Sequence, residues 1–368
     1  MCDLTKYDEW LTKDNVAAIV IREPLVSVEG PDGVIFPATY AAAEDRKVFP
    51  GGYNIDPPEG EKNVCLVDSV GSQANRIEPI FAKAEYAGLI PQIVIEAGEK
   101  KVNLLEAGHR AGDAIVRCTP LQKKLQDAFK SVLKGDAVAM AKIAPTSLVF
   151  GVWDSRDTQA KLPRLVASTI RAFDVQKLSR SAQFNPSADY IGLGLLENTQ
   201  DKKLKDEYAV RGFIHVPATG SHGGVIAKGG VRRDITFSLA ALRLLSAGAD
   251  EKQTLALRRY ILGLSFVALT APAQTYLRQG CNLVPDIDQP RSFTLVSADG
   301  SRSELKLTHD QAIAFAKVAA DKFVVGESQT VKFDPDLAKK DIAGEGDVKQ
   351  TRKKSAKIAA APVEPKPE

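Results

Sequence analysis

Apolar positions along this chain follow two periods, which predict both strands and helices. Short apolar runs or loose alternation predict strands over residues 16–21, 25–28, 64–67, 92–96, 114–118, 147–153, 174–184 and 293–296. Apolar residues spaced three and four apart predict helices over residues 121–133, 235–245, 254–269 and 309–323, the first of them opened by Pro120. Strands separated by amphipathic helices predict an α+β fold in which helices pack against an antiparallel sheet.

A helix is also predicted over residues 161–173, with an apolar side and a basic side. Leu162, Leu165, Val166, Thr169, Ile170 and Phe173 share the apolar side, and Lys161, Arg164, Ser168 and Arg171 share the other. From residue 156 to residue 183 the chain carries six basic residues against only Asp157 and Asp174. The basic side is either an ordinary solvated face or a surface for a polyanion, since surface helices normally mix the two signs.

Gly- and Pro-rich stretches interrupt this pattern and set the expected domain organisation. Residues 31–61 predict an extended loop insertion, and residues 217–230 predict a flexible, glycine-rich hairpin without the spacing of a P-loop or a dinucleotide-binding turn. We expect one domain over residues 1–330. Residues 331–368 are rich in Lys, Ala, Pro and Glu, which predicts a disordered tail.

Composition narrows the class of protein. The chain has 368 residues, 44% hydrophobic and 26% charged, as in soluble globular proteins. The start of the chain lacks the pattern of a signal peptide and no stretch has the length of a transmembrane helix, so we expect a cytoplasmic protein without a membrane partner. Four cysteines and four histidines show no metal-ligand spacing, so we expect no metal and no cofactor.

The net charge of +3 resides in the last 30 residues, where eight basic residues face five acidic ones. Residues 1–338 are therefore neutral, with 41 charges of each sign. If this part of the chain binds nucleic acid, its positive charge must be gathered on one face.

The stretch Asp68-Ser-Val-Gly-Ser-Gln-Ala-Asn-Arg-Ile-Glu-Pro79 follows a predicted strand and is dense in polar side chains. Gly71 permits a sharp turn, and Gln73, Asn75 and Arg76 follow closely. Such groups suit the recognition of phosphate and ribose, because guanidinium is permanently charged and geometrically fixed. The alternative is a capped helix start in which Arg76 pairs with Glu78 or another carboxylate.

Gly71-Ser-Gln-Ala-Asn-Arg-Ile-Glu-Pro79 resembles the signature of a CRISPR-associated family in the RAMP superfamily, the backbone subunit (Cas-seven family) of the type I-G, formerly I-U, Cascade complex. Similar stretches follow in the order expected of that family: Val149-Phe-Gly-Val-Trp-Asp-Ser155, Lys161-Leu-Pro-Arg-Leu-Val-Ala-Ser-Thr-Ile-Arg171, Arg180-Ser-Ala-Gln-Phe-Asn-Pro186 and, more weakly, Arg211-Gly-Phe-Ile-His-Val-Pro217.

This resemblance implies a modified RRM-like (ferredoxin-like) palm with a projecting β-hairpin thumb and helical or loop insertions. It also implies a non-enzymatic protein whose copies line up along a CRISPR RNA beside other Cascade subunits and present the spacer to a target DNA strand. Residues 217–230 are the first candidate for the thumb, and the insertion after Pro31 is the competing one.

With such a role, basic side chains contact phosphates and amides contact ribose, which is a sequence-blind mode of binding. The expected phosphate contacts are Arg76, Lys161, Arg164, Arg171, Lys177 and Arg180. The expected ribose contacts are Gln73, Asn75 and Gln183. Arg156, Arg211, Lys228 and Arg232 complete the predicted RNA-binding set.

Two other classes of function stay open at this point. His215 or His222 beside Lys228 suits general acid–base cleavage at a 2′-hydroxyl, which is the chemistry of a metal-independent RAMP endoribonuclease that processes CRISPR RNA. A small-molecule enzyme is the other class, although the chain shows no phosphate motif, metal cluster or nucleophile motif to support one.

Overall fold

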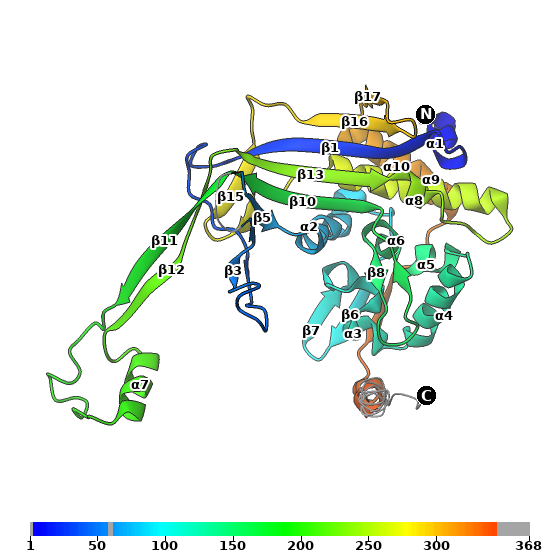
Figure 1. Ribbon diagram of the computed structural model, residues 1–368. Coiled ribbons are helices and arrows are strands. Elements are labelled where there is room, and N and C mark those ends of the chain that lie inside the picture. Colours follow the sequence, from blue (N-terminus) through cyan, green and yellow to red (C-terminus); the bar gives the residue numbers. More distant parts are fainter. Residues whose placement is uncertain (1–2, 58–61, 344–368) are drawn as a thin grey trace, which may run out of the picture.

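The computed structural model describes residues 3–57 and 62–343, and a curled antiparallel sheet lies at its centre (Figure 1). The sheet follows the order β14 (Tyr276–Arg278), β15 (Cys281–Pro285), β1 (Val16–Ser27), β13 (Val231–Ser238), β10 (Val166–Phe173), β5 (Val64–Asp68) and β4 (Ile55–Asp56). Strand β16 (Ser292–Ser297) pairs with the first half of β1, and β17 (Arg302–Glu304) pairs with β16. The fold is mixed α+β, as the sequence predicts.

Alternation along the central strands separates a buried face from an open face. Ile19 and Ile21 of β1 and Ile235 and Phe237 of β13 are buried in one hydrophobic cluster with α9 (Glu251–Thr270) and α10 (His309–Phe323). A Cβ atom at Gly263 of α9 would lie 2.8 Å from the Cα atom of Ala316, so this glycine permits α10 to pack closely. Helices α1 (Asp8–Thr12), α2 (Val70–Ile77) and α8 (Leu239–Leu242) add residues to the same cluster.

The opposite side of the sheet, here called the open face, carries residues of the other parity. On β10 and β13 these are Ala167, Thr169, Arg171, Phe173, Arg232, Asp234 and Thr236, most of them partly or fully exposed. A sheet with one buried face and one solvated face is the usual arrangement for antiparallel strands.

A helical region follows the small sheet β18–β6–β7, in which β6 (Ile93–Ala97) pairs with β7 (Lys100–Asn103). It holds α3 (Ala114–Arg117), α4 (Gln122–Leu133), α5 (Val138–Ile143) and α6 (Thr146–Phe150). The predicted helix after Pro120 is confirmed as α4. The predicted strands over residues 114–118 and 147–153 are wrong, because these short apolar runs form α3 and the fully buried α6, with only β8 (Val152–Trp153) extended. Periodicity does not distinguish a short buried helix from a buried strand.

Two predicted helices are strands in the structure. Residues 161–173 form β9 (Lys161–Leu162), which pairs with β8, and then β10 at the centre of the sheet. The predicted helix over residues 235–245 is β13 as far as Ser238, followed by the single turn of α8. Val166, Thr169 and Ile170 are β-branched and favour an extended backbone, which prevailed over a helical spacing of apolar positions. The basic helical stripe therefore does not exist as predicted.

A long hairpin projects from the sheet (Figure 1). It consists of β11 (Val175–Phe184) and β12 (Val216–Ala227), and α7 (Lys202–Val210) lies at its far end. The predicted glycine-rich hairpin at residues 217–230 is thus only the returning strand and the turn into β13. Gly224 serves close packing, since a Cβ atom there would lie 2.5 Å from Cγ1 of Val34.

The insertion at residues 31–61 packs against the root of this hairpin. It holds β2 (Thr39–Tyr40), β3 (Gly52–Tyr53) and β4, and Ile35 forms a bridge with Val225 of β12. The backbone N–H of Gly224 donates to the hydroxyl of Tyr53 at 3.0 Å. The two sequence candidates for a thumb therefore touch each other, and the hairpin is the one that projects.

The predicted domain boundary at residue 330 falls inside β18 (Gln329–Lys332), which pairs in parallel with β6. Val331 and Phe333 pack against the main hydrophobic cluster, and Arg117 forms an ion pair with Asp341. These contacts explain why residues 331–343 are ordered, although their polar composition predicts disorder. The rest of the predicted tail lies outside the described residues.

Over residues 3–57 and 62–343, no helix combines the length and apolar character that crossing a membrane requires.

Candidate nucleic-acid interface

Asp68, the last residue of β5, is the centre of a buried polar cluster formed by the stretch that the sequence singles out. The carboxylate is fully buried and accepts hydrogen bonds from Gln73 Nε2 at 2.7 Å, Arg76 Nε at 3.1 Å and Arg278 Nη2 at 2.5 Å. Helix α2 starts directly after it, with Ser69 as N-cap accepting from the N–H of Ser72. We call Asp68, Gln73, Arg76 and Arg278 the Asp68 cluster; it fixes α2 against β14.

This cluster engages two of the residues predicted to contact RNA. Gln73 is buried, its amide nitrogen donates to Asp68 and its amide oxygen accepts from Ser168 Oγ at 2.9 Å, so both ends of the amide are bonded inside the protein. A ribose contact by Gln73 stays a prediction, and it would require these hydrogen bonds to break. Arg76 pairs with Asp68, which is the carboxylate alternative that the sequence left open, although the partner is not Glu78.

Glu78 and Asn75 instead hold Arg110, a buried residue of the 3₁₀ turn Arg110–Gly112. Glu78 Oε2 lies 2.6 Å from Arg110 Nε, Asn75 Oδ1 accepts from Arg110 Nη2 at 3.2 Å, and the carbonyl of Gly151 accepts from Arg110 Nη1 at 3.2 Å. Burial raises the pKa of Glu78 to about 7, with Arg110 opposing that shift, and burial lowers the pKa of Arg110. Most of the motif thus orders neighbouring segments, while Asn75 itself is exposed.

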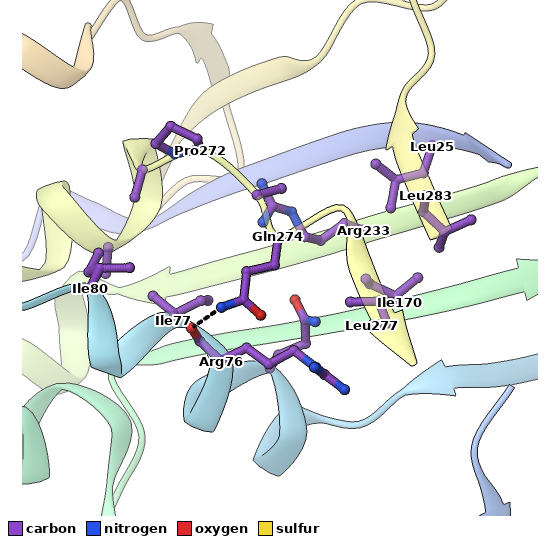
Figure 2. Close-up of a pocket in the computed structure, with 14 residues that line it drawn as sticks. Leu25, Arg76, Ile77, Ile80, Ile170, Arg233, Pro272, Gln274, Leu277 and Leu283 are labelled. Atoms are coloured by element: carbon purple, nitrogen blue, oxygen red, sulfur yellow. Dashed lines mark hydrogen bonds between the residues drawn. The ribbon is translucent and has the colours of Figure 1, made fainter. Parts of the chain in front are cut away.

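The cavity beside Arg76 does not have the size of a ligand site (Figure 2). Its volume is about 30 Å³, and its walls include Ile77, Ile80, Leu277 and Leu283. Gln274 reaches across it and donates to the backbone carbonyl of Arg76 at 3.3 Å. A nucleotide does not fit into this space, which is about the volume of one water molecule in the liquid.

Seven of the remaining predicted residues fall into two groups at opposite ends of β10, and the other three lie farther out on the hairpin. The first group, here called the Trp153 cluster, lies on the β8–β9 hairpin and just before β10. It consists of Trp153, Arg156, Lys161 and Arg164, all exposed. The Nζ atom of Lys161 lies 5.9 Å from the centroid of the Trp153 ring.

The second group lies where β10 ends and the projecting hairpin begins. We call Arg171, Lys177, Lys228 and Arg232 the hairpin-root cluster. Arg171 and Arg232 are direct partners across the β10–β13 ladder, and the guanidinium of Arg232 lies 4.8 Å from the centroid of the Phe173 ring. The backbone N–H of Lys228 donates to the carbonyl of Asp174 at 3.3 Å, which holds the 228–230 turn beside the start of β11. Four basic residues thus lie around the junction between β10, β13 and the hairpin.

A groove of about 670 Å³ runs beside this cluster. Phe173, Lys228 and Arg232 line it together with the last residues of β1 and the turn at residues 30–33. Asp32 and Asp286 contribute acidic groups to its walls. The groove is thus open, mixed in charge and positive on the side of the hairpin.

Three predicted residues lie farther out on the hairpin and are not brought together with the root. Arg180 of β11 stands 5.8 Å from the ring of Phe36, Gln183 is exposed near the end of β11, and Arg211 follows α7 at the far end. A ligand that reaches all three has to follow the length of the hairpin.

Sequence reasoning missed several residues that join these surfaces. Arg22 of β1 and Arg302 of β17 are exposed on the open face and line a depression of about 300 Å³ with Thr294. Phe173 was assigned to the apolar side of a helix, whereas it lies in the groove. Val231, Arg233, Ile235 and Phe237 share the buried face of β13. This alternation with a period of two was the sequence signal for a strand over residues 231–237.

No curated protein matches the chain. Residues 19–177 match the model of the family described as CRISPR-associated protein GSU0053, a region that holds most of β1, the Asp68 cluster without Arg278, the Trp153 cluster and Arg171. This similarity supports a CRISPR-associated protein with a role in CRISPR defence.

Proposed function

We propose that this protein is the CRISPR RNA-binding backbone subunit of a type I-G Cascade surveillance complex. Copies of the chain assemble along the guide RNA with other Cascade subunits and present the spacer for pairing with a target DNA strand. The central sheet is the RRM-like palm of this proposal, and the β11–β12 hairpin is its thumb. The chemistry calls for no cofactor and no catalytic group.

The observation that carries the proposal is the hairpin-root cluster. Four basic residues lie where a long hairpin leaves the sheet, in a chain whose first 338 residues have no net charge. A charge excess gathered in this way is the pattern expected for a phosphate backbone. Arginine and lysine on a groove read backbone rather than sequence, which suits a guide whose sequence varies.

The projecting hairpin supports the same proposal. Arg180 and Gln183 continue the polar surface outward from the root, and α7 ends the hairpin with Arg211. An RNA strand lying in the root groove is then covered on one side by the hairpin, as the thumb of a backbone subunit requires.

No geometric observation favours the endoribonuclease alternative. The ring of His222 packs against Tyr53 with centroids 4.9 Å apart, and His215 lies just before β12 begins. The alternative requires one of these histidines beside Lys228, but six residues along β12 separate His222 from Lys228, about 20 Å at ordinary strand rise, and His215 is farther from it along the same strand.

The test is incubation of the full chain with an end-labelled repeat–spacer RNA, followed by nuclease challenge. The proposal predicts protected segments of RNA, no cleavage by the protein itself, and affinity that falls steeply with salt but changes little between spacer sequences. Cleavage within the repeat supports the endoribonuclease instead, and an RNA that is neither bound nor protected contradicts both.

A further inference from the structure

Trp153 is one of two tryptophans in the chain, and 58% of its side chain is exposed. A single exposed apolar residue needs no explanation by itself. Here the ring has a cation beside it, because Lys161 is the direct partner of Trp153 across the β8–β9 pair and its Nζ atom lies 5.9 Å from the ring centroid; Arg164 packs its side chain close to Gly151, two residues before Trp153.

The loop that carries Arg156 is held firmly beside the ring. Asp154 is buried and accepts from the N–H of Thr158 at 2.9 Å and from its hydroxyl at 2.6 Å, while its own N–H donates to the carbonyl of Ala160 at 2.9 Å. Gln126 of α4 donates to Asp157 at 2.9 Å from outside the loop. These hydrogen bonds hold the loop in place before a ligand binds, which lowers the entropy cost of binding.

A cleft of about 200 Å³ opens next to Trp153. His109, Asp113, Arg117, Ser155 and Arg156 line it with the indole. Asp113 is engaged by the N–H groups of His109 and Ile115, and Arg117 by Asp341. Trp153 and Arg156 thus line one cleft, and Lys161 lies next to the Trp153 ring.

We infer that the Trp153 cluster is a stacking site for an unpaired base of single-stranded RNA, with Arg156, Lys161 and Arg164 facing the neighbouring phosphates. This inference rests on the proposed function and adds a second point of contact to it. The cluster and the hairpin root lie at the two ends of β10, about seven residues apart, which corresponds to about 20 Å of extended strand. A strand of RNA spans that distance in a few nucleotides and is held at both ends.

The chemistry favours a nucleobase over a peptide. Aromatic side chains beside a positive groove are the usual platform for single-stranded nucleic acid, because every base has a face that stacks and every linkage carries a charge. A proline-rich peptide, the other common partner of an exposed tryptophan, gains little from Lys161 beside the ring and Arg156 in the same cleft.

The test uses the Trp10→Phe variant of the full chain, in which Trp153 is the sole fluorescent tryptophan. Titration with single-stranded oligouridylate at low salt is expected to quench the emission, whereas inorganic polyphosphate, which has charge but no bases, is expected to leave it unchanged. Binding itself is followed separately by the anisotropy of end-labelled RNA. In the same anisotropy assay Trp153→Ala should weaken RNA binding by about five- to a hundredfold, and Trp153→Phe should retain most of the affinity.

The outcomes separate this inference from the proposed function. If wild-type protein binds labelled RNA but Trp10→Phe shows no quenching and Trp153→Ala binds equally well, the stacking site is wrong and the proposed function stands. Equal quenching by polyphosphate, or quenching by a proline-rich peptide alone, also overturns it. If the wild-type protein does not bind RNA at all, both fail. Folding of each variant is checked by circular dichroism, and Trp153→Phe serves if Trp153→Ala is unstable.

Discussion

Arg171 and Arg232 stand directly opposite each other across the β10–β13 ladder, so that two like charges are neighbours on the open face of the sheet. Arg171 Nη1 donates to the neutral hydroxyl of Thr169 at 2.7 Å, and Arg232 forms an ion pair with Asp234 at 2.8 Å. Like charges placed opposite each other destabilise a sheet. An anion bound between them removes that cost, which is what the proposed RNA backbone supplies.

The double variant Arg171→Ala/Arg232→Ala is therefore expected to lose RNA affinity without losing stability. Binding at moderate salt should fall by at least about tenfold, and the slope of log affinity against log salt should shrink by about 1.4 if two phosphate contacts are lost. The melting temperature should stay the same or rise. Lys252→Ala/Lys317→Ala removes the same charge from exposed positions of α9 and α10 and is the matched control. Equal weakening by both pairs would mean that net charge alone, and not this junction, binds the RNA.

Asp68→Asn is expected to have the opposite effect: it should lower the stability of the protein and not its affinity for RNA. The substitution leaves the guanidinium groups of Arg76 and Arg278 without their shared carboxylate, and each of these side chains is only about a quarter exposed. The expected loss is about 2–4 kcal/mol in the free energy of unfolding, with Arg76→Ala costing less because Arg278 still pairs with Asp68. Urea denaturation measures both. A stable Arg76→Ala protein with clearly weaker RNA binding would instead return Arg76 to the set of RNA contacts.

The buried Glu78–Arg110 pair predicts a dependence of stability on pH. Burial raises the pKa of Glu78 from the ordinary 4.5 to about 7 in the folded protein. Between these values the folded state binds more protons than the unfolded state, so this contribution is complete below pH 4.5 and is lost as the pH rises through 7. Relative to Glu78→Gln, the wild-type protein should lose up to about 3 kcal/mol over this window. Urea denaturation of both proteins at pH 5 and pH 7.5 tests this prediction. If the difference in free energy of unfolding between the two proteins is the same at both pH values, the prediction is contradicted.

Strand β18 predicts the effect of shortening the chain. Truncation after residue 328 removes the parallel partner of β6 together with the packing of Val331 and Phe333. It should lower the melting temperature by more than ten degrees relative to the full chain, at about 4 °C or less per kcal/mol for several kcal/mol of lost burial in a chain of this size. Truncation after residue 343 keeps these contacts and is the comparison. Equal melting temperatures for the two truncated proteins would show that β18 adds nothing to stability.

The sequence predicted the class of the fold and the ends of α10 and α4, because a steady period of apolar positions runs through each of them, whereas the longest helix, α9, begins three residues before the predicted start. It failed at residues 161–173, where Leu165, Val166, Thr169, Ile170 and Phe173 fit a helical period by coincidence. In β10 the buried set is instead Val166, Ser168, Ile170 and Ala172, and Ser168 is acceptable there because Gln73 accepts its hydrogen bond.

The candidate interface could be predicted only in part from the sequence, for a related reason. Basic residues gathered between residues 156 and 183 are visible in the sequence, but pairing decides which of them face a ligand. Arg171 meets Arg232 only because β10 and β13, about 60 residues apart in the chain, are neighbours in the sheet. The roles of Gln73 and Arg76 depend on Arg278 and Ser168, which no local pattern connects to them.

The central claim is that RNA lies against the root of the projecting hairpin. The most direct measurement is photocrosslinking of the full chain to a repeat–spacer RNA that carries 4-thiouridine throughout the spacer, followed by mass spectrometry of the modified peptides. The account predicts adducts on peptides that contain Phe173, Lys177 and Lys228, and their loss in Arg171→Ala/Arg232→Ala at moderate salt. Bound RNA that crosslinks elsewhere and leaves these peptides unmodified would contradict it.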